Sequence, residues 1–272
     1  MAVQLFSRMP FSLAYQRNMF PVSNEIFNMV LTYVKKKTNG RPLEMALDVG
    51  CGTGRFTLPL APHFKKVLGI DISDSQINVA EQYNTASNVS YMVAAAEKLP
   101  MKNDSVDLVN ASLAAHWFTI DKFASEAMRV LKREGCLALH GFIPANEIEY
   151  KNLSHDLTVV MLETWDTLFQ HVDTRSTDHM LCQYQTIFEA IPLKDKERIT
   201  DINVKSPMTI PEIIGFFQSI YMFQQFLEKD AERAKQFLIH VERRIRDILG
   251  EEAYSARLNV YMKHYCVLAC KH

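Results

Sequence analysis

The sequence predicts an α/β protein with a parallel, doubly wound sheet, and three observations carry this prediction. A short apolar strand at Met45–Val49 runs directly into glycines spaced two residues apart. A second apolar strand at Lys66–Ile70 is followed by an aspartate, Asp71. Beyond it, strand-like and helix-like segments alternate along the chain, which is the pattern of parallel strands joined by helices.

Local signals place the first helices. Ser23 can cap a helix that runs to about Lys37, where an Asn-Gly pair ends it. Pro59 and Pro62 stand where a helix should follow the glycine-rich turn. Because a proline inside a helix costs about 3 kcal/mol or more, we expect this helix to be short or kinked.

The following segments continue the alternation. Ser73 and Gln76 form a capping-box pattern, which predicts the start of a helix. In chain order we expect this helix to reach Tyr83, with strands at Val89–Val93 and Val106–Asn110, an amphipathic helix at Ile120–Leu131 and a fifth strand at Cys136–Gly141.

The second half of the chain has a different pattern. Apolar residues at helical spacing predict a helical insert at 144–195, after the fifth strand. We then expect a strand at Arg198–Lys205, a long amphipathic helix at Leu227–Ile248 lying on the sheet, and a last strand at Asn259–Lys271. The chain is therefore predicted to be one domain, 1–272, in four parts: an N-terminal lid and helix (1–40), an α/β half with the glycine-rich turn (41–143), the insert (144–195), and C-terminal strands with the long helix (196–272).

Composition argues against several classes of protein. The 30 Lys and Arg residues nearly balance 31 Asp and Glu residues, unlike the basic surface of a nucleic-acid binder. Five cysteines without a CxxC pair argue against a disulfide framework or a metal site and favour a reducing compartment. No apolar run reaches the ~18 residues of a membrane span. We expect a cytoplasmic monomer or homodimer without metal, although Arg8 and Arg17 in the acid-free stretch 1–24 leave a mitochondrial leader as an alternative.

The segment Leu47–Phe56 carries the chemistry. Glycines allow a tight turn and a close approach of ligand to backbone, and the helix after them offers free N–H groups. This is the architecture of a nucleotide-type cofactor site at the carboxyl edge of a sheet. Asp71 can accept hydrogen bonds from both hydroxyls of a ribose, or it can simply cap the next helix. Arg55 occupies the third glycine position of a dinucleotide motif, which disfavours a nicotinamide oxidoreductase.

These residues resemble the motifs of class I S-adenosylmethionine-dependent methyltransferases. Asp48–Phe56 and Asp71 resemble the first motif and the acid that follows it. The further matches over about 44–142 are Ala95–Pro100, Asp104–Val109 and Ala127–Lys132. The resemblance implies a Rossmann-like, seven-stranded sheet with helices on both faces, S-adenosyl-L-methionine as the cofactor, and 41–143 as the cofactor-binding half. The cofactor contacts that it implies are Asp48, Gly50, Cys51, Gly52, Gly54, Asp71, Ile72, Ala96, Glu97 and Ala111.

A narrower resemblance concerns the acceptor. Ala114–Phe118 resembles small-molecule methyltransferases that include trans-aconitate methyltransferase. It implies a small-molecule acceptor; a carboxylate would give a methyl ester without a catalytic base. The acceptor contacts that it implies are Tyr15, His116, Trp117 and Phe142. His116 is the catalytic candidate, and a structural histidine is the alternative.

Other functions stay open at this point. The chain could methylate a hydroxyl, amine or carbon acceptor, or it could be a non-catalytic cofactor-binding scaffold or sensor. The sequence does not distinguish Arg8, Arg17 and Arg175 as clamps for an anionic substrate.

Overall fold

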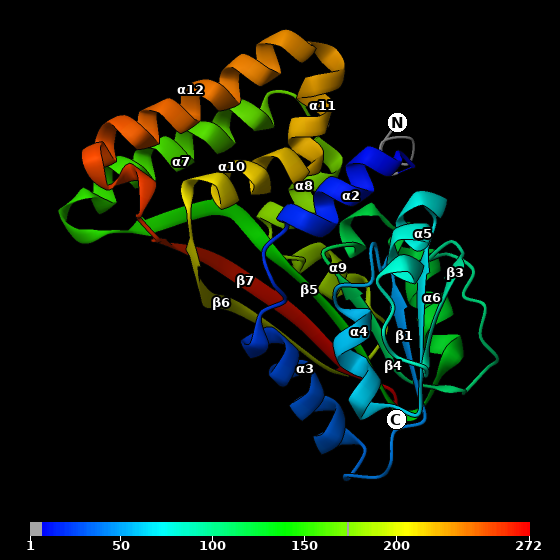
Figure 1. The fold of residues 1–272 in the computed structure, drawn as a ribbon. Coiled ribbons are helices and arrows are strands. Elements are labelled where there is room, and N and C mark those ends of the chain that lie inside the picture. Colours follow the sequence, from blue (N-terminus) through cyan, green and yellow to red (C-terminus); the bar gives the residue numbers. More distant parts are fainter. Residues whose placement is uncertain (1–6, 173) are drawn as a thin grey trace.

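The structure, a computed structural model, describes residues 7–172 and 174–272, without the side chains of 145–146 and 174–176. In this part of the chain, seven strands form one sheet in the order β3-β2-β1-β4-β5-β7-β6 (Figure 1). The strands are β1 (Met45–Val49), β2 (Lys66–Asp71), β3 (Val89–Val93), β4 (Val106–Ser112), β5 (Leu131–Glu149), β6 (Asp195–Met208) and β7 (Leu258–Cys270).

The sheet is parallel from β3 to β5, and β7 runs antiparallel to both β5 and β6. The strand order reverses between β1 and β4, which lie side by side. In open α/β sheets, ligands bind outside the carboxyl ends of the strands at such a reversal. The topology therefore predicts a ligand-binding site at the carboxyl ends of β1 and β4.

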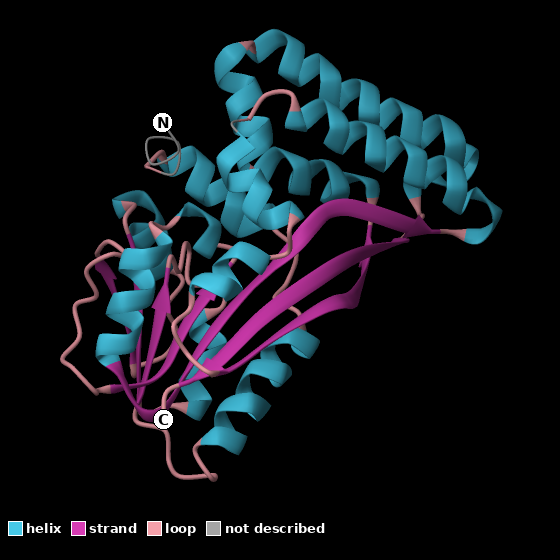
Figure 2. Ribbon diagram, turned by 180° about the vertical axis from the view of Figure 1, so that it is seen from behind, coloured by secondary structure: helices cyan, strands magenta, loops and turns pink. Residues whose placement is uncertain are grey.

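Helices cover both faces of the sheet, as predicted (Figure 2). One face carries α3 (Asn24–Lys37), which packs on β5 and β7, and α4 (Thr57–Leu60), which packs on β2; both helices belong to one apolar cluster. The other carries α6 (Ile120–Val130) and α9 (Gln185–Ala190). The predicted cap of α3 is present, since the Ser23 hydroxyl accepts a hydrogen bond from the Ile26 N–H at 3.3 Å.

The remaining elements complete the fold. They are α2 (Met9–Asn18), η1 (Ala61–His63), α5 (Asp74–Gln82), η2 (Ala115–Trp117), η3 (Lys151–Leu153), α7 (Ser154–Phe169), α8 (Thr174–Leu181), α10 (Ile210–Ser219), α11 (Tyr221–Lys229), α12 (Ala231–Leu249) and η4 (Gly250–Tyr254). In Figure 1, α7, α10, α11 and α12 gather beyond the far ends of β5 and β7. There they share one apolar cluster with residues of those two strands.

The fifth strand is longer than predicted. It runs over Leu131–Glu149, so the insert begins only at 151, not at 144. Pairing with β7 continues from Asn146 to Glu149 after a register shift that follows Phe142. These residues are strand because β7 supplies the hydrogen-bond partners, a long-range effect that their local sequence does not reveal.

The long C-terminal helix was predicted wrongly in two respects. Leu227 belongs to α11, and α12 begins after Asp230, whose carboxylate caps the Arg233 N–H at 3.1 Å. Moreover, α12 packs on α7 and α11 rather than lying on the sheet. Helix α10 was missed, although its capping box, Thr209 and Glu212, is visible in the sequence. The short helix expected at Pro59 is confirmed, because α4 ends at Leu60.

Candidate functional site

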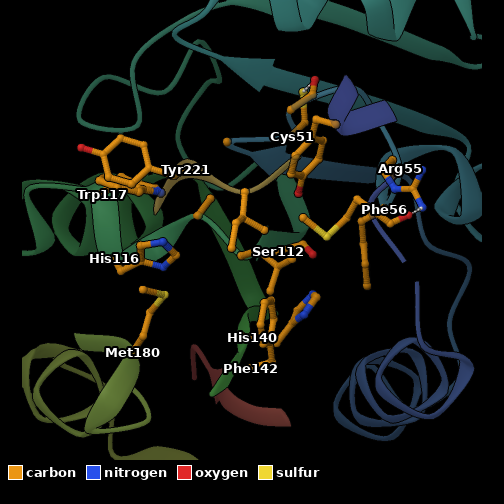
Figure 3. Close-up of a pocket in the computed structure, with 18 of the residues that line it drawn as sticks. Cys51, Arg55, Phe56, Ser112, His116, Trp117, His140, Phe142, Met180 and Tyr221 are labelled. Carbon is orange, nitrogen blue, oxygen red and sulfur yellow. Dashed lines mark hydrogen bonds between the residues drawn. The ribbon is translucent and has the colours of Figure 1, made fainter. Parts of the chain in front are cut away.

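A cavity of about 420 Å³ lies at the carboxyl ends of β1, β2 and β4 and continues over β5 and β7. Figure 3 shows Ser112, the last residue of β4, between Cys51 of the glycine-rich turn and His140 of β5. The α2 helix and the link from α2 to α3 contribute Tyr15 and Phe20 to the wall. One cavity therefore joins the glycine-rich turn to the antiparallel part of the sheet.

The three glycines of the turn have different structural reasons. A Cβ on Gly50 would lie 2.5 Å from the Ala114 Cβ, and one on Gly54 would lie 2.3 Å from the Tyr91 hydroxyl. A Cβ on Gly52 would meet nothing closer than 3.7 Å, and Gly52 lines the cavity. Packing thus excludes a side chain at the first and third positions, whereas the second leaves space that a ligand can use.

Asp71 lies at the cavity wall, where its carboxylate accepts hydrogen bonds from the Gly52 and Ser73 N–H groups, both at 2.9 Å. Burial raises the pKa of this carboxyl group, while its backbone donors lower it; the net shift is upward. Each carboxylate oxygen can accept more than one hydrogen bond, so capacity for a ligand remains.

Gln76 supplies a second polar group beside Gly52. Its side-chain oxygen is buried and has no hydrogen-bond partner among the described residues. The predicted capping box is only half formed: Ser73 accepts from the Gln76 N–H at 3.2 Å, but the Ser73 N–H donates to Asp71. The Gln76 oxygen is therefore available to a donor in the cavity.

Asp48 lies behind the cavity wall. Its carboxylate accepts hydrogen bonds from the Thr57 hydroxyl at 2.6 Å and the Asn110 amide at 2.7 Å. Burial raises its pKa to about 6, against the opposing effect of these two donors. Gly54 and Ala111 also lie outside the cavity lining. The other predicted cofactor residues line it: Gly50, Cys51, Gly52, Asp71, Ile72, Ala96 and Glu97.

Arg55 holds the N-terminal helix over the glycine-rich turn. Its guanidinium donates to the backbone carbonyls of Gln16, Met19 and Phe20 at 2.8 to 2.9 Å. These carbonyls lie at and just beyond the end of α2, where helices leave acceptors unpaired. Sequence reasoning treated Arg55 only as a departure from a dinucleotide motif. Its role in docking α2 depends on the tertiary structure.

The four predicted acceptor residues, Tyr15, His116, Trp117 and Phe142, all line the cavity. His116 Nδ1 hydrogen-bonds the Tyr184 hydroxyl at 2.9 Å, and the Trp117 ring meets Tyr221 edge-on at 4.7 Å. Burial, with a smaller contribution from His179, lowers the pKa of His116 to about 3. His116 is therefore neutral at pH 7 and a weak base.

Sequence reasoning missed two histidines in this cavity, His140 of β5 and His264 of β7. His140 was visible just before a glycine at the end of the predicted fifth strand. Nothing local indicated His264, because only the antiparallel register sets it opposite Phe142. Of the arginines considered as clamps, Arg8 pairs with Glu228, Arg8 and Arg17 lie outside the cavity lining, and the side chain of Arg175 is outside the described residues.

One group of three potential metal ligands occurs within the described residues: Asp195, Cys270 and His272, with donor atoms within 4.8 Å of one another. Asp195 already accepts from Lys37 and His272, so this cluster has an internal structural explanation. Over the same residues, every helix is too short or too polar to cross a bilayer.

Comparison with known proteins agrees with this geometry. Residues 47–139 match the family model of a methyltransferase domain. A Dictyostelium discoideum protein named as a methyltransferase is 28% identical over 218 residues, covering 78% of this chain and 76% of that protein. A solved Anaeromyxobacter dehalogenans protein described as a type II methyltransferase has a TM-score of 0.70 at 21% identity, covering 89% of this chain and 97% of that one.

A second solved structure has a similar fold. Phosphoethanolamine N-methyltransferase 2 of Haemonchus contortus, in complex with S-adenosyl-L-methionine, has a TM-score of 0.51 at 16% identity. The match covers 100% of this chain and 60% of that one. The domain match over residues 47–139 and the methyltransferase relatives identify the chain as an S-adenosylmethionine-dependent methyltransferase with the class I fold, and S-adenosyl-L-methionine is its cofactor.

The residues present fit this cofactor. The open side of Gly52, the carboxylate of Asp71 and the unpartnered Gln76 oxygen lie at one end of the cavity. Together they offer backbone room and hydrogen-bond acceptors to a ligand that carries hydroxyl and ammonium donors.

Proposed function

We propose that the chain transfers the methyl group of S-adenosyl-L-methionine to a small-molecule acceptor bound in the same cavity. The observation that carries this proposal is one continuous cavity whose lining includes Asp71, His140 and residues of α2. Two molecules placed end to end in such a space are held close and shielded from water, which promotes a bimolecular displacement.

The cofactor supplies an already activated methyl group. In this proposal, Asp71 accepts hydrogen bonds from its ribose hydroxyls, and Gln76 accepts from a further donor. Ile72, Ala96 and Glu97 line the part of the cavity beside Asp71 and would pack around the adenine. Asp48 would act indirectly, since it holds Thr57 and Asn110 below the turn.

At the acceptor end, the chain orients the acceptor and excludes water. Tyr15, Trp117 and Phe142 would pack on it. His116 would hold a polar group rather than remove a proton, because its low pKa makes it a weak base. A carboxylate acceptor needs no base; a hydroxyl acceptor must lose a proton. A non-catalytic binding protein would share the cofactor end but would transfer no methyl group.

The proposal includes the cellular setting. We propose a cytoplasmic protein that acts as a monomer or homodimer, without nucleic acid. The balanced charge and five free cysteines support this setting. Sedimentation of the purified chain would determine the oligomeric state.

Binding of S-adenosylhomocysteine tests the cofactor site. Calorimetry should show that Asp71→Ala weakens binding by about 1.5–3 kcal/mol, the value of hydrogen bonds to a charged group. Asp121→Ala is the matched control, because Asp121 is an exposed acid on α6, outside the cavity lining. Unchanged affinity in Asp71→Ala would contradict the site. Transfer of labelled methyl to any member of an acceptor panel would then exclude a purely binding role.

A further inference from the structure

The cavity has an end built from β5, β7 and the link between α2 and α3. His264 is directly opposite Phe142 in the antiparallel pair. The Phe20 and Phe142 rings lie 6.1 and 5.9 Å from the His264 ring, and the Phe56 ring lies 4.7 Å from that of His140. The strands β5 and β7 lie two and three positions from β1 in the sheet order, so this histidine–aromatic end is the other end of the cavity from Gly52 and Asp71.

The two histidines have unsatisfied polar atoms. His140 Nε2 and both ring nitrogens of His264 are buried and have no hydrogen-bond partner among the described residues. Both histidines are almost inaccessible to solvent, with 4% of each residue exposed. Since buried polar groups in proteins are nearly always hydrogen-bonded, and leaving one unpaired costs about 1–3 kcal/mol, these nitrogens are suited to bind a ligand.

This end also lacks a free charge. Among the described lining residues, the acids Asp71 and Glu97 belong to the cofactor end, and the single Arg or Lys is Arg55. Its guanidinium donates to three backbone carbonyls. Burial lowers the pKa of His140 to about 3 and that of His264 to about 4, so both imidazoles are neutral at pH 7. A carboxylate placed here would lose its hydration without meeting a cation.

The donors and acceptors of the two histidines indicate which chemical group of a ligand can bind at this end. A neutral imidazole offers one N–H donor and one acceptor nitrogen, and on His264 both are unpartnered. A hydroxyl group both donates and accepts. A carboxylate only accepts and an ammonium only donates, so each can pair with only one of the two kinds of ring nitrogen, whereas a hydroxyl group can donate to one histidine and accept from the other. The aromatic walls of Phe20, Phe56 and Phe142 favour a flat, apolar body.

We propose that the histidine–aromatic end is the acceptor subsite, and that it takes an uncharged, flat, apolar molecule whose hydroxyl group is bound by His264 and His140. This inference rests on the proposed function, because it names the class of acceptor for the same site.

Three probes of matched size test this class: 4-ethylphenol, ethylbenzene and 4-ethylbenzoate. Their affinities are measured by calorimetry on the whole chain saturated with S-adenosylhomocysteine. We expect 4-ethylphenol to bind about fivefold to tenfold more tightly than either other probe, the ratio expected for one or two net hydrogen bonds. Tighter binding of 4-ethylbenzoate, or equal binding of all three, would overturn the proposal.

Variants of His264 assign the preference to the subsite. His264→Phe should remove the advantage of 4-ethylphenol over ethylbenzene, while His264→Gln, which keeps a donor and an acceptor, should retain part of it. His155→Phe is the matched control, because His155 is exposed on α7. If His264→Phe fails to fold, the loss of preference is sought in His140→Phe. An unchanged preference in the folded variant would show that the imidazoles do not bind the hydroxyl group.

The proposed function and the proposed acceptor class can be disproved separately. If S-adenosylhomocysteine does not bind, the proposed function fails. If it binds and the probes show no preference for the phenol, only the acceptor class is wrong.

Discussion

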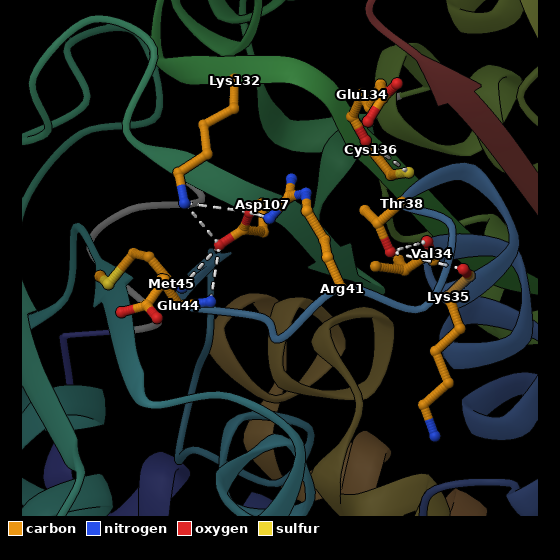
Figure 4. Close-up of polar contacts among 10 residues, drawn as sticks. All are labelled: Val34, Lys35, Thr38, Arg41, Glu44, Met45, Asp107, Lys132, Glu134 and Cys136. Carbon is orange, nitrogen blue, oxygen red and sulfur yellow. Dashed lines mark hydrogen bonds and ion pairs between the residues drawn. The ribbon is translucent and has the colours of Figure 1, made fainter.

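Buried ionisable groups have charged partners at the amino edge of the sheet, but only neutral partners or none at the carboxyl edge. At the amino edge, Asp107 is fully buried and accepts hydrogen bonds from Arg41 at 2.6 Å, Lys132 at 2.9 Å and the Glu44 and Met45 N–H groups (Figure 4). Burial raises its pKa, but these donors together lower it more, so the carboxylate stays ionised. This edge joins the starts of β1, β4 and β5 through paired charges.

At the carboxyl edge, buried groups have neutral partners or none. Asp48 has Thr57 and Asn110, and its pKa rises to about 6. The histidines of the cavity shift in the other direction, toward the neutral form. In both cases burial favours the uncharged state. From this difference we infer that the amino edge stabilises the fold, whereas the carboxyl edge leaves polar groups without partners, so that a ligand can form hydrogen bonds with them.

The largest effect expected from this contrast between the two edges is a pH dependence of the free energy of unfolding. His116, His140 and His264 stay neutral when folded but take up protons near pH 6.5 when unfolded. Stability is therefore complete above pH 6.5 and should fall by about 2 kcal/mol per histidine by pH 5. Asp48, with a raised pKa, opposes this in part, because the folded state binds its proton first. Urea unfolding at pH 7, 6 and 5 measures the combined effect of the three histidines and Asp48 on stability.

The double variant His140→Asn/His264→Asn is the control for that measurement. Two of the three titrating groups are then gone, so its stability should fall less steeply between pH 7 and pH 5. A wild-type stability that is constant over this range would show that the carboxyl edge does not hold its histidines neutral.

The amino edge should show a smaller but still large effect. Asp107→Ala leaves Arg41 and Lys132 without their counter-charge and two N–H groups without an acceptor. We expect a loss of about 3 kcal/mol in the free energy of unfolding at pH 7. The folded fraction should still bind S-adenosylhomocysteine with normal affinity. A loss below about 1 kcal/mol would mean that this network is not a stabilising one.

Substitution of two glycines at the carboxyl edge distinguishes a role in packing from a role in leaving space for a ligand. Gly54→Ala would press a methyl group against Tyr91 at a backbone φ of +80°, and should cost about 1–3 kcal/mol in stability. Gly52→Ala, at φ +55°, has room in the protein and should cost about 1 kcal/mol. Its larger effect should be weaker S-adenosylhomocysteine binding. Thermal unfolding and calorimetry on both variants separate the two roles; equal profiles would contradict the distinction.

The smallest effect is expected for Asp48→Asn. Its partners are neutral, and an asparagine oxygen can still accept from Thr57 or Asn110. The free energy of unfolding at pH 7 should change by less than about 1 kcal/mol, against the larger loss in Asp107→Asn. Equal losses in the two asparagine variants would remove the contrast between the edges.

Much of the first half of the fold was predictable because its signals are local. The strands at Met45 and Lys66, the cap at Ser23 and the short helix at Pro59 depend on neighbouring residues alone. That Gly52 and Asp71 line one cavity was predictable for the same reason, since both lie in short motifs. The end of the cavity at β5 and β7 was only partly predictable. His264 reaches the cavity through the register of β7, and no neighbouring residue encodes that register.

The sequence by itself determined the α/β class, the turn rich in glycine and the acid at the end of the next strand. Tertiary structure decided which glycine faces the cavity, how far β5 extends, that α12 packs on helices, and that His140 and His264, far apart in the sequence, line the same cavity. The physical reason is range: dihedral preferences and hydrophobic period act over a few residues, whereas burial and strand pairing join residues separated by more than a hundred positions.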